Sequence, residues 1–387
     1  MDAGRHALNI ILSTDCIKYP LTGIGRYAFE LAQELQGREG VSLRFLHGLH
    51  MQDNLAIAAE SAVPMQGIKK RLQQSKLVND IYRFTWPLAK SVVLRKQPSH
   101  IYHSPNYYIP PAIKHAVATF HDLSIFHWPQ FHPTGRVHLM QHELRNTVKR
   151  AQHFITDSEY TRRELSDFFS LDLDRITVAP LACNRSFHPR DEGDVAQVLK
   201  QYGLAWREYL LYTGTIEPRK NIITLLRAYD RLEAVEKRHF PLVISGYKGW
   251  ESRELFSLFE RGEREGWLKY LGFVPGRDLP MLYSAARAFV FPSTYEGFGL
   301  PALEAMASGT PVICSDASSL PEVVGDCALM HQPDDVDRLC EHLTTLINDN
   351  TVHLKLSQQG PVRAQQFSWS HCADRTIAAY KQVAQTL

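Results

Sequence analysis

The sequence lacks the features that mark secreted and membrane-spanning proteins. None of its 387 residues lies in an apolar run approaching the roughly 18–20 residues that span a bilayer. Its start also lacks the basic and apolar regions of a signal peptide. We therefore expect a cytoplasmic protein without a transmembrane helix.

Cysteine is scarce, and the cysteines that are present are scattered. No two of them form a C-x-x-C pair, and no histidine follows at the spacing of a metal finger. We expect small core residues in a reducing compartment rather than disulfides or ligands of a structural metal. The six cysteines are Cys16, Cys183, Cys314, Cys327, Cys340 and Cys372.

Net charge is also small. The formal charge of +2 does not indicate a nucleic-acid partner, and no basic stretch is interleaved with aromatic residues in the manner of a recognisable binding module. Any function that depends on positive charge must therefore be local to a few residues.

The pattern that is present is an alternation of short apolar runs with amphipathic segments, which is typical of parallel sheets covered by helices. A chain of this length favours two domains of about 150–200 residues each. We predict helices at 221–234 and 335–349, and two series of strands separated by the loop 183–194. The strands are 6–14, 41–48, 100–105, 116–122, 153–158 and 176–182, then 209–215, 241–247, 269–274, 288–293 and 311–316.

A glycine pattern, Gly-x-Gly-x-x-Ala, occurs in "LTGIGRYAF" at residues 21–29. A dinucleotide turn needs its first glycine at the strand end and an acidic residue after the next strand. Here eight residues separate Thr14 from Gly23, and the next strand closes on His47 and Gly48. Two interpretations remain. The segment is either a tight loop, or a loop that leads into a helix at 26–36 whose free N–H groups and dipole bind an anion.

Two glutamates flank a second glycine-rich turn in "TYEGFGLPALEAMASGTPVICSD", residues 294–316. Glu296 precedes the turn and Glu304 lies one turn into a helix that Pro301 can start and Gly309 can end. Each carboxylate can accept hydrogen bonds from neighbouring sugar hydroxyls, and the helix start between them can bind a diphosphate. The alternative is a capped surface helix with solvated glutamates.

These motifs together resemble the family 4 retaining glycosyltransferases of the GT-B fold. The resemblance rests on Glu-x7-Glu, "TGIGRY" and "GTIEPRKN" (214–221), and it extends to "TFHDLS", "DSEYTRREL" and "FSWSHCADRTIAAY". It implies an α/β protein with two Rossmann-like domains whose parallel sheets face a central cleft. Residues 1–185, joined by a final helix at 370–387, would bind the acceptor, and residues 193–366 would bind a nucleotide sugar.

The resemblance also implies roles for individual residues. Glu304 corresponds to the carboxylate that holds the ribose, Glu296 to the one near the donor hexose, and Lys220 to the lysine on the diphosphate. His121, followed by Asp122, corresponds to the His-Asp element near the reacting sugar. The implied catalytic residues are His121, Glu296, Arg219 and Lys220, and the implied donor-binding residues are Gly23, Gly25, Gly214, Phe298, Gly299, Leu300 and Glu304.

One position departs from the family pattern. Many members carry arginine directly after the glycine at 214, where this chain has Thr215. We expect Arg219 to take over the phosphate contact, unless it only caps the start of helix 221–234. With two cations available, we expect no metal, and the Asp-x-Asp matches at 172–174 and 335–337 are interpreted as turns or helix starts.

The segment 69–96 carries eight basic residues against one acid, Asp80, and contains apolar residues. It could lie on an anionic membrane, although a solvated basic face is an equal alternative, and Pro87 is expected to interrupt any helix there. The motifs look most like bacterial hexosyltransferases, often mannosyltransferases, of O-antigen and related polysaccharide assembly. That likeness implies GDP-mannose as donor, a lipid-linked or oligosaccharide acceptor, and peripheral contact with the cytoplasmic face of the inner membrane.

Several alternatives stay open at this point. A UDP-sugar could replace GDP-mannose, because no residue visibly reads the base. A sugar phosphorylase or synthase of the same fold would use the same cleft, a nicotinamide oxidoreductase would need the missing acidic residue, and a ligand-binding protein without activity would keep the fold. Retention of anomeric configuration is implied by resemblance only, since the sequence offers no obvious nucleophile.

Overall fold

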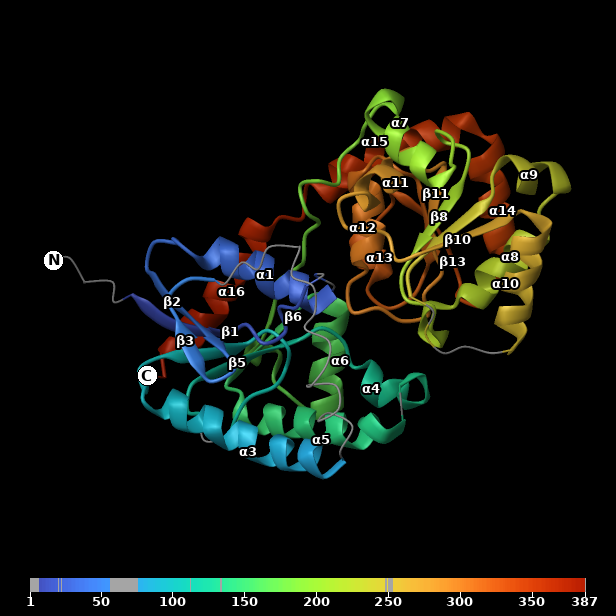
Figure 1. Ribbon diagram of the computed structural model, residues 1–387. Coiled ribbons are helices and arrows are strands. Elements are labelled where there is room, and N and C mark those ends of the chain that lie inside the picture. The colour runs from blue at the N-terminus through green and yellow to red at the C-terminus, as the bar shows by residue number, and fades with distance from the viewer. Residues whose placement is uncertain are drawn as a thin grey trace.

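Two β-sheets, one in each half of the chain, organise the fold and confirm the predicted α/β class (Figure 1). The computed structural model describes residues 7–19, 21, 23–55, 76–111, 113–132, 134–247, 249 and 253–386, with the side chains of 76–85, 131, 134 and 136 left undescribed. Within each half, apolar strands lie between layers of helices, as the alternation in the sequence predicts.

The first sheet has seven strands in the order β3-β2-β1-β4-β5-β6-β7. All neighbouring strands are parallel except β3, which runs antiparallel to β2. The short edge strand β3 was not predicted from the sequence. The strands are β1 (Leu8–Ser13), β2 (Val41–His47), β3 (His50–Gln52), β4 (Ile101–Ser104), β5 (Ala116–Phe120), β6 (His153–Thr156) and β7 (Ile176–Val178).

Helices accompany this sheet, and one of them corrects an expectation. Helix α3 (Lys76–Arg95) continues through Pro87, which therefore does not interrupt it. A proline inside a helix lacks one N–H donor and strains the preceding turn, and this helix accommodates it. The other helices are α1 (Gly23–Leu35), α4 (Ser124–His127), η1 (Pro129–Phe131), α5 (Thr134–Arg150), α6 (Glu159–Phe169) and η2 (Leu173–Arg175).

The second sheet has six parallel strands in the order β10-β9-β8-β11-β12-β13. Strand β8 begins the series, and the order reverses between β8 and β11. Ligands of such sheets bind beyond the carboxyl ends of the strands near this reversal. The strands are β8 (Leu210–Thr213), β9 (Leu242–Ser245), β10 (Leu268–Gly272), β11 (Ala288–Phe291), β12 (Val312–Ser315) and β13 (Ala328–His331), the last of which was not predicted.

Helices of the second half largely follow the predicted pattern. The expected helix 221–234 is divided, because the chain turns between Asp230 and Ala234. Asp335 caps the helix that follows it, as expected for the Asp-x-Asp match at 335–337. The helices are α7 (Glu192–Tyr202), η3 (Pro218–Lys220), α8 (Ile222–Asp230), α9 (Ala234–His239), α10 (Arg253–Glu265), α11 (Leu279–Ala285), α12 (Leu300–Ala307), α13 (Leu320–Val324), α14 (Val336–Asn348) and α15 (Asn350–Ala364).

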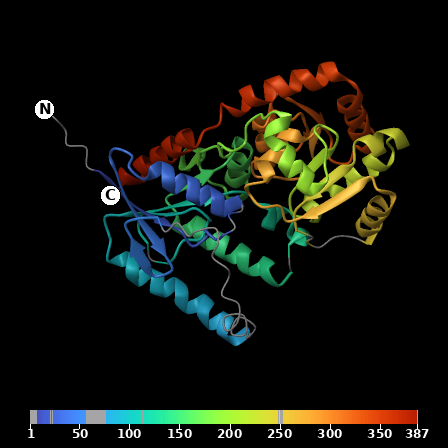
Figure 2. The same ribbon diagram turned by 45° about the horizontal axis from the view of Figure 1, so that its top comes forward.

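The last helix, α16 (Trp369–Ala384), returns from the second half to the first (Figure 2). It packs against α1 and against strands β6 and β7. The buried hydroxyl of Tyr380 lies 2.7 Å from Nδ1 of His103, and Arg375 donates to the carbonyl of Val178. The C-terminal helix therefore belongs to the packing of the N-terminal sheet.

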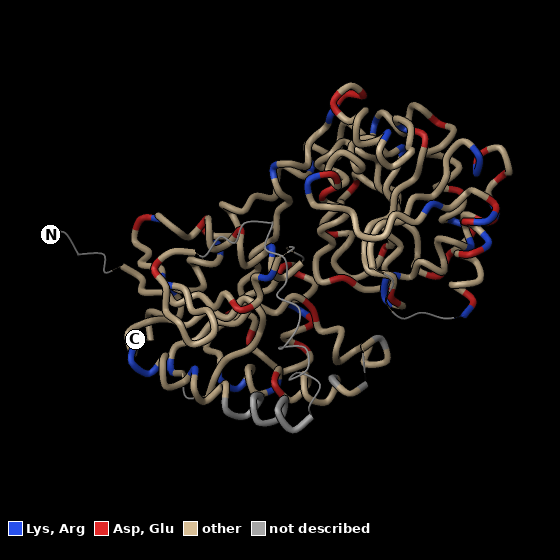
Figure 3. Tube along the Cα trace, viewed as in Figure 1, with Lys and Arg blue, Asp and Glu red and all other residues tan. Residues whose placement is uncertain are grey.

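The surface carries both signs of charge, with Lys and Arg interspersed among Asp and Glu over both halves (Figure 3). All six cysteines are free; Cys314 and Cys372 are buried and the other four are half-buried. None of the helices in the described part of the chain is long and apolar enough to cross a membrane.

Candidate active site

Two glycines lie at the carboxyl ends of the neighbouring strands β8 and β9. Gly214 has a φ of +148° and Gly246 a φ of +142°, a backbone region that side chains disfavour. A Cβ at Gly246 would overlap the carbonyl oxygen of Gly214. The backbones of the two strand ends therefore approach each other closely, which a side chain at Gly246 would prevent.

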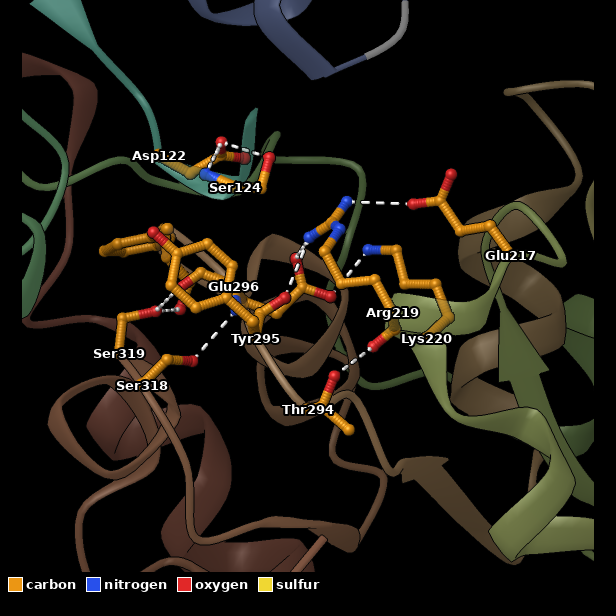
Figure 4. A network of polar contacts seen from close by, with 12 residues as sticks. Asp122, Ser124, Glu217, Arg219, Lys220, Thr294, Tyr295, Glu296, Ser318 and Ser319 are labelled. Carbon is orange, nitrogen blue, oxygen red and sulfur yellow. Dashed lines mark hydrogen bonds and ion pairs between the residues drawn. The ribbon is translucent and has the colours of Figure 1, made fainter. Parts of the chain in front are cut away.

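A cluster of three buried charged side chains connects the segment after β8 to the loop after β11 (Figure 4). Glu296 bonds Lys220 Nζ through Oε1 at 2.6 Å and Arg219 Nη1 through Oε2 at 3.0 Å. The side chains of all three are 15% exposed or less. Burial raises the pKa of Glu296, but Lys220 and Arg219 outweigh it and bring that pKa down to about 2, so this carboxylate is ionised.

Arg219 has further partners that fix its position. Its guanidinium donates to the carbonyl of Tyr295 at 2.8 Å and to Glu217 at 3.0 Å. Burial opposes its charge, but Glu296, Asp122 and Glu217 raise its pKa above the ordinary range. Burial lowers the pKa of Lys220, with Arg219 acting in the same direction and Glu296 against it.

Asn221 fixes the backbone that presents this cation pair. It takes a left-handed conformation with a φ of +53° between η3 and α8. Its side-chain amide donates to the carbonyls of Pro292 and Pro333, at 3.0 and 2.6 Å. Asparagine tolerates this backbone region well, so the final residue of "GTIEPRKN" ties the loop to the end of β11.

The second glutamate motif folds as a loop followed by α12. Gly299 is the N-cap of that helix with a φ of +109°, and a Cβ there would lie 2.5 Å from Leu320. The Ser319 hydroxyl lies 2.9 Å from the carbonyl oxygens of Glu296 and Phe298. The amides of Phe298, Gly299 and Leu300 stand at the start of α12, where helix N–H groups lack intrahelical acceptors.

Glu304 lies in the second turn of α12 and is 8% exposed. Burial raises its pKa to about 7, while Arg26 of α1 and the hydroxyl of Tyr283 act in the opposite direction. Its surroundings thus differ from those of Glu296 although both carboxyls are buried. Arg26, within "TGIGRY", was not expected at the site.

The glycines of "TGIGRY" lie inside the first turn of α1 rather than in a loop before a helix at 26–36. Gly23 opens the helix with a φ of +34°. A Cβ on Gly25 would lie 2.8 Å from the carbonyl oxygen of Cys16, so the helix start packs directly on the loop after β1. The helix starts at the pattern itself because the glycine permits that contact.

His121 follows β5 on the other wall of the cleft. Its Nδ1 lies 2.7 Å from Asp157 Oδ2 and its Nε2 lies 2.8 Å from the carbonyl oxygen of Pro105. Burial disfavours the charged ring, but Asp157 and Pro105 outweigh it and raise the pKa of His121. Each ring nitrogen of His121 therefore has an oxygen within hydrogen-bond distance, which fixes the orientation of the ring.

The two walls touch beside His121. The carbonyl of Gly297 accepts a hydrogen bond from Ser158 Oγ at 2.7 Å, and a Cβ on Gly297 would overlap the carbonyl oxygen of His121. Tyr295 reaches across, accepting from the amide of Leu123 at 2.9 Å and donating to Glu164. The loop before α12 is therefore part of the contact between domains.

The structure brings some of the residues predicted for the site into direct contact and places the others on neighbouring elements. Glu296, Arg219 and Lys220 are in direct contact, and Gly214, Phe298, Gly299, Leu300 and Glu304 lie on the strand ends and helix around them. Gly23 and Gly25 approach on α1, and His121 lies on the opposite wall. Sequence reasoning missed Asp157 and Tyr295, although both are polar residues close to the carboxyl ends of buried strands.

Comparison with known proteins identifies the family. A model described as glycosyltransferase family 4 matches residues 21–187, and one described as glycosyl transferases group 1 matches residues 200–363. O-antigen chain mannosyltransferase B of Escherichia coli is 44% identical over 379 residues, which are 97% of this chain and 100% of that protein. The chain belongs to glycosyltransferase family 4.

Other family 4 relatives match less of the chain. O-antigen chain mannosyltransferase RfbU of Salmonella typhimurium is 30% identical over 225 residues, covering 58% of this chain and 59% of that protein. Family 4 membership makes the chain a glycosyltransferase that takes a nucleotide-sugar donor and a glycan acceptor. It therefore excludes the nicotinamide oxidoreductase that the glycine pattern left open.

Solved structures confirm the GT-B fold. WaaG, a glycosyltransferase of lipopolysaccharide biosynthesis, aligns with a TM-score of 0.71 at 14% identity over 95% of this chain and 98% of that one. HepE of Anabaena, in complex with UDP and glucose, aligns with a TM-score of 0.68 at 18% identity over 98% and 99%. At these identities the likeness concerns the arrangement of the two sheets.

Proposed function

We propose that this family 4 enzyme is a retaining mannosyltransferase that moves mannose from GDP-mannose to a lipid-linked glycan such as a lipopolysaccharide O-antigen chain. The observation that carries the mannosyl and O-antigen assignment is the 44% identity over 97% of the chain with a protein of that name. The retaining course and the GDP donor rest on the family resemblance.

The charged cluster supports the chemistry of donor cleavage. When the bond between the anomeric carbon and the phosphate oxygen breaks, negative charge builds on the departing nucleoside diphosphate. Arg219, Lys220 and the amides at the start of α12 would stabilise that charge most strongly in the transition state.

Glu296 keeps this cation pair ordered before the donor binds. An isolated buried cation is costly, and the carboxylate compensates two of them through ion pairs of 2.6 and 3.0 Å. When the diphosphate takes over these cations, Glu296 becomes available to accept hydrogen bonds from hydroxyls of the donor hexose. The same carboxylate would therefore serve the free and the loaded enzyme.

A pair of exposed aromatic rings supports recognition of a nucleobase. Tyr247 follows β9 and Phe273 follows β10, and the rings stack at 5.5 Å with an interplanar angle of 22°. They are 55% and 45% exposed, at the same sheet edge as Gly246. A purine could stack on this pair while Glu304 holds the ribose.

The test is a panel of GDP, UDP, ADP and their sugar conjugates, scored by thermal shift and by transfer to a mannoside. A ligand at 100 times its Kd stabilises the protein by about 2.7 kcal/mol. We expect selective stabilisation by GDP and GDP-mannose and mannosyl transfer. Selective response to a UDP-sugar would overturn the donor, and turnover that requires free phosphate would indicate a phosphorylase.

Peripheral membrane contact through 69–96 is a separate part of the proposal. Residues 69–75 lie outside the described residues, and Lys90 is buried in an ion pair with Asp15, so that cation is not available to a membrane. In α3, the side chains of Leu88 and Val92 are 60% and 57% exposed, and the exposed Arg95 and Lys96 follow at the end of the helix. These four residues support contact with an anionic surface.

Vesicle flotation tests this contact with phosphatidylcholine vesicles that contain or lack phosphatidylglycerol. We expect binding only to the anionic vesicles and a loss of binding in Leu88→Ser/Val92→Ser. Val235→Ser, at a residue 58% exposed on α9 of the other domain, is the matched control. Equal flotation of both variants would remove this segment from the proposal.

A further inference from the structure

A groove of about 870 Å³ lies beside the active site and is used by none of the roles assigned above. The first domain contributes α6 and the end of α4, which lie on the side of that domain nearer the second (Figure 1). The second domain contributes residues 318–322. Arg219, Lys220 and Glu304 do not line it, so it is distinct from the donor-binding part of the cleft.

Aromatic rings provide the apolar part of the groove. Tyr160 and Phe168 line it and are 38% and 37% exposed. Phe168 packs at 4.7 Å from Phe126 and 5.3 Å from His127, and Tyr160 lies 6.2 Å from Tyr295, measured between ring centroids. The rings are therefore held in place while their surfaces remain accessible, as is typical of residues that bind the apolar faces of a ligand.

Carboxylates provide the polar part and restrict the chemistry of the ligand. Four carboxylates, Glu159, Glu164, Asp167 and Glu322, line the groove against one arginine, Arg163, which forms an ion pair with Glu159 at 3.3 Å. This surplus of negative charge disfavours a phosphate or a nucleotide. Carboxylate oxygens that accept hydrogen bonds, next to aromatic rings, instead suit an uncharged ligand rich in hydroxyl groups.

The groove is connected to the donor loop by two residues. Ser318, in a left-handed conformation with a φ of +51°, accepts a hydrogen bond from the amide of Glu296 at 2.9 Å. Glu164 accepts a hydrogen bond from Tyr295, the residue before Glu296. A ligand that contacts Ser318 or Glu164 is therefore one hydrogen bond away from the loop of Tyr295 and Glu296, which is proposed to contact the donor hexose.

We propose that this groove is a subsite for sugar residues of the acceptor glycan that lie away from the reacting end. The inference rests on the proposed function, since it assigns the groove to the glycan of the same reaction. Tyr160 and Phe168 stack on the pyranose faces, and Glu164 and Asp167 accept from hydroxyl groups. A glycan held there contacts both domains at once, which favours the closed arrangement of the cleft.

Direct binding tests the subsite without any need for turnover. Mannose and α-mannotriose are titrated into the full chain, with protein-observed NMR or calorimetry as the readout. We expect mannotriose to bind the wild type and Tyr160→Ala/Phe168→Ala to bind it about tenfold more weakly, a loss of about 1.4 kcal/mol. The affinity for GDP should stay unchanged in the variant, because neither ring lines the donor site.

Leu173→Ala is the control, since Leu173 is 43% exposed on the same domain but does not line the groove. Failure of the wild type to bind mannotriose, or equal binding by wild type and groove variant, would overturn the subsite. Loss of GDP-mannose as donor with mannotriose binding intact would instead overturn the proposed function alone.

In a transfer assay, the KM for a mannotrioside should rise in the groove variant while the KM for a monomannoside with the same aglycone and the KM for GDP-mannose do not. An equal rise for both acceptors would mean that the groove acts on folding or closure rather than on the distant sugars.

Discussion

The two walls of the cleft are built differently. On the C-terminal wall, the residues proposed to bind the donor come from two short stretches, 214–221 and 294–304, and Glu217, Arg219, Lys220 and Glu296 from these stretches form one ion cluster. On the N-terminal wall, His121 depends on Asp157, which lies 36 residues further along the chain. The first wall is assembled largely by local sequence and the second by packing of separate strands.

The difference also concerns charge. On the C-terminal wall, Lys220 and Arg219 bring the pKa of Glu296 down to about 2, so this carboxylate is ionised throughout the physiological range. Glu304, at the back of the same wall, has a pKa raised to about 7, mainly by burial. Substitutions at single residues of each wall test whether the two walls act independently.

The largest effect should come from Lys220→Ala. Loss of one charge-stabilising donor typically lowers kcat about 10²–10³-fold, or about 3–4 kcal/mol, because the leaving diphosphate is less well stabilised. GDP-mannose turnover and the far-UV circular dichroism spectrum are measured together. Lys237→Ala, which removes only a bond to the carbonyl of Asp230, is the control. Nearly full activity in Lys220→Ala would show that Arg219 alone carries this role.

Glu304→Ala should weaken nucleotide binding by about 1–3 kcal/mol, through loss of hydrogen bonds to the ribose, without unfolding the protein. Titration calorimetry with GDP measures the effect. Unchanged affinity would remove Glu304 from the donor site.

The pKa of Glu304 adds a dependence on pH to this prediction. Since the ionised carboxylate is the stronger hydrogen-bond acceptor, affinity for GDP should rise with pH through about 7 and level off above it. The free protein should show the opposite trend. The folded state retains a proton that the unfolded state loses above the ordinary pKa of 4.5, so its free energy of unfolding falls as pH rises toward 7. Glu304→Gln should abolish both trends, and their persistence would assign them to another group.

Asp157→Asn should have a smaller effect, about a tenfold loss of kcat, because it leaves the reacting groups in place and alters only the charge and orientation of His121. Asp157 raises the pKa of His121, so the variant should lose its imidazolium at a lower pH than the wild type. Histidine NMR and a pH–rate profile give the two readouts. A fall in activity with an unshifted His121 titration would contradict the positioning role.

The sequence predicted residues of the C-terminal wall because they lie in two short stretches with recognisable motifs. Glu296 and Glu304 are separated by one helix start, Arg219 and Lys220 are adjacent, and the family resemblance assigns both pairs to the donor. The direct contact of Glu296 with both cations is seen only in the structure. The sequence also predicted both parallel sheets from their apolar runs, with the exception of strands β3 and β13.

The N-terminal wall could not be predicted in the same way. That Asp157 accepts from His121, and that Tyr295 donates to Glu164 of the other domain, depends on how strands and domains pack. The start of α1 also could not be predicted from the sequence. Gly23 and Gly25 suggested a loop, and only the contact of Gly25 with the carbonyl of Cys16 explains why the helix begins there.

The smallest effect is expected from removal of metal ions. We expect Arg219 and Lys220 to turn from Glu217 and Glu296 to the diphosphate when the donor binds, and so to neutralise it without a divalent ion. Transfer from GDP-mannose should proceed at the same rate, within about twofold, in EDTA and in Mg²⁺ or Mn²⁺. The matched test repeats this in Lys220→Ala, where an added ion could replace the lost charge. Activity of the wild type that returns only with Mg²⁺ or Mn²⁺ would show that the two cations are insufficient, and the contrast between the walls would then require a metal on the C-terminal side.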